Sequence, residues 1–172
     1  MVYNFQLVDE NIWGIDSNAY FKGGKGFWAK AGNSVQEFKI TADTFGARTV
    51  SLHVRTGDSG SSTNMVASYA LEFDGSGIPL TLDQSRPPEW KPDIFGGAWM
   101  GYLNGTISID EKVEKIMKLK VSAAFSAYDA LLIGEPSGSG GGGSYDEGYI
   151  DGDADRKVKD QNFLNDMFAL PE

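Results

Sequence analysis

The sequence predicts an all-β fold, a β-sandwich of the jelly-roll type, over residues 1–136. Three observations support this prediction: short segments alternate apolar and polar residues, turn-forming residues separate them, and few stretches have the periodicity of a helix. The clearest alternation spans residues 48–55. One face of this expected strand carries Val50, Leu52 and Val54, and the other carries Ser51, His53 and Arg55.

The expected strands follow one another along this part of the chain. They cover residues 35–40, 48–55, 68–73, 106–109, 116–121 and 130–133. Clusters of turn-forming residues separate them at 23–24, 57–60, 74–77, 87–88 and 104–105. Residues 110–119 could also carry a helical pattern, but we read them as a turn followed by a strand.

Composition limits the classes of function. The chain has 172 residues, of which 41% are hydrophobic, so it holds enough apolar material for a core and is not of disordered composition. Its net charge of −9 argues against binding to nucleic acid and to an anionic membrane surface. No apolar run is long enough to span a bilayer. Without cysteine there is no disulfide, thiolate metal site or cysteine nucleophile.

The beginning of the chain lacks the basic and apolar regions of a signal peptide. Either the protein is cytoplasmic, or Met1 begins a segment of a secreted parent protein. We expect the second, because the binding function inferred below is typical of secreted systems.

The composition changes sharply at Pro136. Residues 137–144 are glycine and serine only, which predicts a flexible linker and looks like an engineered fusion linker. Residues 145–172 form an acidic tail with eight acidic and three basic residues, so the tail carries −5 of the total −9. Leu164, Met167 and Phe168 would share one face of a short helix near its end.

One motif invites a catalytic reading. The Gly-Asp-Ser-Gly segment at 57–60 resembles the nucleophile motif of chymotrypsin-like proteases, but a triad needs an oriented histidine and His53 is the only histidine. The segment is better explained as a hairpin turn. Paired carboxylates can catalyse hydrolysis without fixed spacing, yet none sits in a recognisable motif. We therefore expect a protein that is not an enzyme.

Five aromatic residues fall in segments rich in glycine or proline, where loops are expected: Phe27, Trp28, Trp90, Trp99 and Tyr102. Loops on a rigid scaffold commonly carry binding residues. A flat indole can stack on the apolar face of a sugar ring while polar neighbours pair with its hydroxyl groups. The alternative for each ring is that it closes one end of the sandwich.

Four segments carry a resemblance to a known family. Residues 25–40, with Gly-Phe-Trp at 26–28, are followed by 46–55, by Gly-Ala-Trp-Met-Gly-Tyr at 97–102, and by 127–133. In this order they resemble carbohydrate-binding modules of the family 6 and family 35 type. The resemblance implies a β-jelly roll whose cleft is clamped by two aromatic rings, here Trp99 and either Phe27 or Trp28. Trp90 would add a contact or belong to an oligomer interface.

The same resemblance implies a structural calcium ion, with Asp129 and an acid at Asp9 or Glu10 as ligands. Hard oxygen ligands suit calcium. The tail adds a weaker likeness: residues 151–162 resemble half a dockerin, an EF-hand-type loop with Asp151, Asp153 and Asp155 as ligands. Arg156 replaces its turn glycine, Asn162 replaces its bidentate acid, and the second repeat is missing. The alternative predictions for the tail are an acidic disordered segment and an interaction peptide for a protein partner.

From the sequence we expect non-catalytic binding of a polysaccharide or oligosaccharide, which targets an associated enzyme or assembly to the polymer. The alternative is a structural β-sandwich subunit of a surface filament, adhesin or phage decoration, whose tail docks on a partner. Neither reading identifies the glycan.

Overall fold

The computed structural model describes residues 2–3, 9–41, 45–57, 62–94, 97–110 and 114–135. The predicted linker at 137–144 and the predicted tail at 145–172, with its candidate ligands Asp151, Asp153 and Asp155, lie outside the described residues. Within the described part of the chain, no helix has the length and apolar character needed to cross a membrane.

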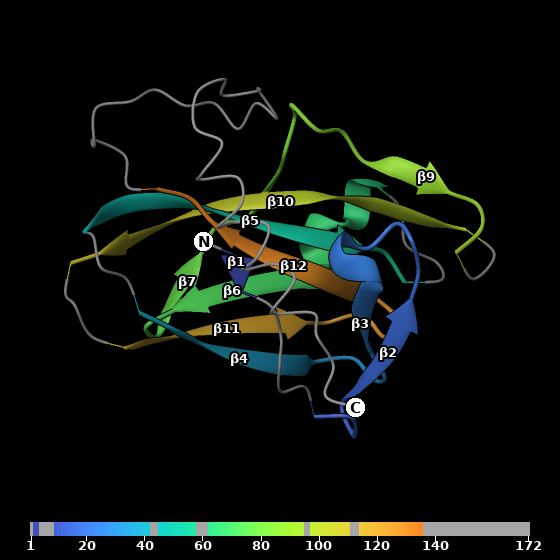
Figure 1. Ribbon diagram of the computed structural model, residues 1–172, viewed down its shortest axis with the longest axis horizontal. Coiled ribbons are helices and arrows are strands. Elements are labelled where there is room, and N and C mark those ends of the chain that lie inside the picture. The colour runs from blue at the N-terminus through green and yellow to red at the C-terminus, as the bar shows by residue number, and fades with distance from the viewer. Residues whose placement is uncertain are drawn as a thin grey trace, which may run out of the picture. The chain divides into compact units, whose positions relative to one another are not determined.

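Two antiparallel sheets face each other, as Figure 1 shows. Sheet A has the order β2-β3-β12-β5-β10-β8, with β1 pairing β12 and β9 pairing β10. Its strands are β1 (Val2–Tyr3), β2 (Trp13–Ser17), β3 (Lys25–Ala29), β5 (Gly46–Arg55), β8 (Thr81–Leu82), β9 (Glu89–Lys91), β10 (Ala98–Ile109) and β12 (Ala127–Ile133). Sheet B has the order β4-β11-β6-β7. Its strands are β4 (Ser34–Ile40), β6 (Tyr69–Phe73), β7 (Ser76–Ile78) and β11 (Lys115–Val121).

The chain crosses repeatedly between the sheets, so that strands adjacent in space are rarely adjacent in sequence. Three short 3₁₀ turns interrupt it: η1 (Lys22–Gly24), η2 (Ser62–Asn64) and η3 (Val66–Ser68). These features confirm the predicted fold class, a β-sandwich of the jelly-roll type.

The core lies between the sheets. From sheet A, Val50, Leu52 and Val54 of β5 point into it and are buried, as the alternation predicts. They share one cluster with Leu71 of β6 and Leu119 of β11 in sheet B. Each buried aliphatic side chain of this size contributes about 1.5–3 kcal/mol to folding, so this cluster is the main source of stability of the sandwich.

Strand β10 differs from the sequence prediction. It spans Ala98–Ile109 and pairs with β5 along the register from Met100↔Arg55 to Ile109↔Gly46. The expected turn at 104–105 is therefore wrong, and Trp99 and Tyr102 lie on a strand instead of in a loop. The glycines make room for neighbours: a Cβ at Gly105 would lie 2.6 Å from the Ile78 side chain. The strand expected in the second half of 110–119 is confirmed, since β11 begins at Lys115, whereas the expected turn falls at 111–113, outside the described residues.

Tyr69 connects the two sheets. Its side chain comes from β6 in sheet B, and its hydroxyl can donate to the main-chain oxygens of Arg55 and Ala127 in sheet A, at 2.6 and 2.7 Å. Burial is the main cause that raises the pKa of Tyr69 far above its usual range, so the hydroxyl keeps its proton. It therefore remains a hydrogen-bond donor at neutral pH.

We predict that Tyr69→Phe lowers the free energy of unfolding by about 1–3 kcal/mol, because the substitution removes a buried hydrogen bond without changing the ring. Urea unfolding followed by circular dichroism measures this change. An unchanged midpoint would contradict the role of Tyr69 as a connection between the sheets.

Candidate functional site

The outer face of β5 is buried as well as its inner face. Ser51, His53 and Arg55 point away from sheet B, and their exposed fractions are only 7%, 7% and 3%. A buried polar group is costly unless it is hydrogen-bonded. Each of the three side chains has such a partner, and each partner comes from a different part of the chain.

Ser51 is bonded to the segment before β9. The Arg86 Nη2 donates to Ser51 Oγ at 3.0 Å, and its Nε donates to Asp83 Oδ2 at 2.7 Å. The other Asp83 oxygen accepts from the main-chain N–H and the hydroxyl of Ser85, at 2.9 and 2.6 Å. Burial alone would raise the pKa of Asp83, but the hydrogen bonds from Ser85 and Arg86 outweigh it and hold this pKa far below its usual range. Asp83 is therefore ionised and keeps Arg86 in place.

His53 is bonded to β12. Its Nδ1 lies 2.6 Å from Asp129 Oδ1, and both side chains are buried. The other Asp129 oxygen accepts the main-chain N–H of Lys22 in η1. The Tyr102 ring packs beside the His53 ring at 4.5 Å, and the Arg86 guanidinium lies over Tyr102 at 3.7 Å. This contact joins the His53 and Ser51 groups into one polar network across sheet A.

Arg55 is bonded to β2 and to the turn before β12. Its Nη1 donates to Asp16 Oδ2 at 3.0 Å, and its Nη2 donates to the main-chain oxygen of Phe125 at 2.9 Å. Phe125 has a φ of 62°, a left-handed conformation that is unfavourable for a residue with a side chain. The surrounding hydrogen bonds hold it there, since its own N–H donates to the Ala29 oxygen at 2.8 Å.

These contacts surround one end of sheet A. In the register of the sheet, Ala127 pairs with both Trp28 and Arg55, and Arg55 pairs with Met100. Four aromatic side chains gather at this end, which we call the aromatic end: Trp28, Trp90, Trp99 and Phe125.

Trp90 and Trp99 form the first aromatic pair. They face each other across β9 and β10, with ring centres 5.6 Å apart in an edge-to-face arrangement. Trp90 is 48% exposed. Its ring lies against Gly97, where a Cβ would come within 2.0 Å of it. Gly97 also has a φ of 112°, so only glycine fits this position well.

Trp28 and Phe125 form the second pair. Their rings stack with centres 5.7 Å apart, and Phe125 is 45% exposed. The indole of Trp28 lies across Gly14 of β2, where a Cβ would be 2.0 Å from the ring. In each pair an exposed ring contacts a half-buried tryptophan, and a glycine makes room for one of the indoles, Gly97 for Trp90 and Gly14 for Trp28.

The two pairs lie on opposite faces of sheet A. Trp28 packs with an outer cluster that includes Phe21 and Met100, whereas Trp99 packs against the core between the sheets. Strands β12 and β5 separate β3 from β10, so the backbones that carry Trp28 and Trp99 are roughly 14 Å apart at the usual strand spacing.

The five aromatic residues predicted to bind the ligand thus lie in different places in the structure. The structure brings Trp90 and Trp99 together but separates both from Trp28. Phe27 packs against the core, 5.6 Å from the Tyr128 ring, and Tyr102 belongs to the polar network. Phe125 was missed, because nothing in the sequence marks a phenylalanine in a left-handed turn as an exposed platform.

The candidate calcium ligands have protein partners. A calcium ion at Asp129 would have to displace His53 or the Lys22 N–H, and Asp9 Oδ1 accepts the Asn11 N–H at 2.9 Å. The main-chain oxygen of Glu10 accepts from Lys30 at 2.5 Å. Across the described ranges, no three histidine or acidic side chains gather as metal ligands do. Calcium binding stays a prediction of the family resemblance.

Comparisons with known proteins add little. No protein-family model matches the chain, and no curated protein matches it. A solved structure to which it is similar is the CBM35 from Cellvibrio japonicus Abf62, with a TM-score of 0.48 and 16% sequence identity, over 80% of this chain and 95% of that chain. At this level of similarity, the ligand must be argued from the residues of the chain itself.

We predict that Asp83→Asn lowers the free energy of unfolding at neutral pH by about 1.5–3 kcal/mol, because the bonds from Arg86 and Ser85 lose their charged acceptor. The native pKa lies below the value in the unfolded chain, so this stability is present above about pH 4 and is lost as the pH falls further. Unfolding from pH 2 to pH 7 measures it. The variant should show a shallower loss in acid than the wild type and a Glu135→Gln control, and parallel curves would contradict the account.

Proposed function

We propose that the protein binds carbohydrate without catalysis, and that the aromatic end is its binding surface. One observation carries the proposal: two rings, Trp90 and Phe125, are about half exposed although each is held in a fixed position by a neighbouring tryptophan. Exposed aromatic faces held in this way are available to stack on a ligand.

The chemistry of the aromatic end suits a sugar. The apolar face of a pyranose loses contact with water when it stacks on a flat ring, and a ring that is already fixed loses little entropy on binding. Beside Trp90, β9 carries Glu89 and Lys91, which pair with each other and are exposed enough to exchange that bond for sugar hydroxyl groups. Two separate exposed rings give the aromatic end room for more than one sugar unit.

The role of this binding in a larger system is also a proposal. A non-catalytic module that holds a polysaccharide would keep an associated enzyme or assembly at the polymer and raise its effective concentration there. The predicted linker at 137–144 is suited to such a tether. In the competing view the exposed rings contact a protein neighbour in an assembly.

We predict that Trp90→Ala and Phe125→Ala each weaken binding by about 1–3 kcal/mol, or roughly 5–150-fold, by analogy with other aromatic stacking platforms. The protein would first be applied to a glycan array, and the affinity of each variant for the best glycan would then be measured by calorimetry. Phe45→Ala is the matched control, because Phe45 is 54% exposed but precedes β5, at the other end of that strand.

Two results would contradict the proposal. One is an unchanged affinity of both variants for a glycan that the wild type binds. The other is the absence of glycan binding together with self-association that Trp90→Ala abolishes in size-exclusion chromatography, which would support the assembly view.

A further inference from the structure

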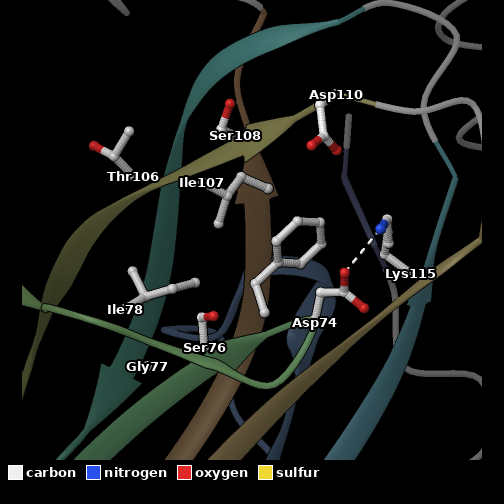
Figure 2. Close-up of a pocket in the computed structure, with 10 residues that line it drawn as sticks. Asp74, Ser76, Gly77, Ile78, Thr106, Ile107, Ser108, Asp110 and Lys115 are labelled. Atoms are coloured by element: carbon white, nitrogen blue, oxygen red, sulfur yellow. Dashed lines mark hydrogen bonds and ion pairs between the residues drawn. The ribbon is translucent and has the colours of Figure 1, made fainter.

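A hollow lies far from the aromatic end. It has a volume of about 290 Å³ and opens between β7 and the last part of β10, where the edges of the two sheets diverge (Figure 2). We call it the edge groove. Trp99 and Ser108 are nine residues apart on β10, which is roughly 30 Å along an extended strand. A ligand in the edge groove would therefore be distinct from one at the aromatic end.

The topology of the sheets leaves this groove open. Strand β7 pairs with β6 on one side and is the last strand in the order of sheet B. On sheet A, β8 pairs with β10 at Leu103 and Asn104. Ile107 follows these residues on β10, and its side chain points into the core. The neighbouring Thr106 and Ser108 therefore border the groove largely with their main chain. Main-chain donors and acceptors along a strand edge are strong hydrogen-bonding groups.

The lining combines an apolar floor with a few polar groups. Phe73, Ile78 and Ile107 are buried and form the floor. Above it, Asp74 is paired with Lys115 at 2.7 Å, and Figure 2 shows Asp110 across from this pair. Asp110 has no side-chain partner among the described residues. A small hollow with an apolar base and a few directed polar groups is typical of a small-molecule site.

The charges of the lining limit the ligand. Asp74, Asp110 and Lys115 sum to −1, which disfavours a carboxylated, sulfated or phosphorylated ligand. Carboxylates accept hydrogen bonds well from hydroxyl groups, and the Lys115 ammonium donates them. The volume is close to the lower limit of small-molecule sites, about 300 Å³, and suits one sugar ring.

We propose that the edge groove binds a single neutral sugar residue. The choice of sugar as ligand class rests on the proposed function, whereas the groove and its charge do not. Asp110 accepts from the sugar hydroxyl groups, and the apolar floor contacts its C–H face. With the aromatic end about 30 Å away, one molecule would hold a polymer at two places, which raises its overall affinity without new contacts at either.

Backbone amide NMR of the full chain tests this inference. The protein would be titrated with the methyl glycosides of glucose, galactose, mannose and xylose, and separately with glucuronic acid. We expect at least one neutral glycoside to shift the amides of Ser76, Asp110 and Lys115. Asp110→Ala should lower the affinity measured from these shifts by about tenfold, because a charged acceptor is lost. Glu135→Gln, at an exposed acid outside the groove, and Trp90→Ala should leave them unchanged.

The outcomes separate this inference from the proposed function. Shifts confined to the aromatic end would overturn the edge groove as a site and leave the proposed function intact. Groove shifts that Asp110→Ala leaves unchanged, or that appear with glucuronic acid and with no neutral glycoside, would overturn the inference as well. Groove shifts that persist in Trp90→Ala while the aromatic end shows no response to any glycan would support the groove and refute the aromatic end as the binding surface. No shifts at all would overturn the edge groove as a site, and the glycan array then tests the aromatic end separately.

Discussion

Burial of both faces of β5 is the constraint on which the rest of the structure depends. Its inner face is apolar and packs in the core, but its outer face presents Ser51, His53 and Arg55, which cannot be buried without partners. The partners come from outside the strand: Arg86 and Asp83 from the segment before β9, Asp129 from β12, Asp16 from β2 and the main chain at Phe125. Supplying hydrogen-bond partners to the outer face of β5 therefore fixes the positions of four other segments.

Those segments carry or adjoin three of the four aromatic rings of the aromatic end. Arg86 precedes Trp90 by four residues, Phe125 accepts directly from Arg55, and Asp16 lies on β2, where Gly14 underlies the ring of Trp28. The polar network thus gives the aromatic end its rigidity, which stacking on a sugar requires. It also explains why the His53–Asp129 pair need not indicate catalysis: it is buried beside Tyr102, and its function is to hold β5, β12 and η1 together.

The sequence predicted the fold class because the residue alternation at 48–55 is a local signal. It also predicted that Ser51, His53 and Arg55 share a face, but periodicity cannot show whether that face is covered, since the covering residues lie up to 76 positions away. Glycine was misread for a similar reason. Gly97 and Gly105 make room for the side chains of Trp90 and Ile78, and propensity does not reveal such a close approach. The turn expected at 104–105 therefore belongs to strand β10. The sequence left Phe27 and Trp28 as alternative partners of Trp99, and the alternation of side chains along β3 places Phe27 against the core, as Trp99 is, and Trp28 against the outer cluster. Whether Trp99 and Trp28 bind a sugar stays a prediction.

The central claim is that the aromatic end is a preformed sugar platform. Its most direct test uses the indole N–H signals of the four tryptophans in a ¹⁵N NMR titration with a glycan identified on an array. The account predicts that the signals of Trp90 and Trp99 shift, that Trp28 responds through Phe125, and that Trp13, which is only 1% exposed, does not. Saturation of the protein with glycan while the signals of Trp28, Trp90 and Trp99 stay fixed would contradict it.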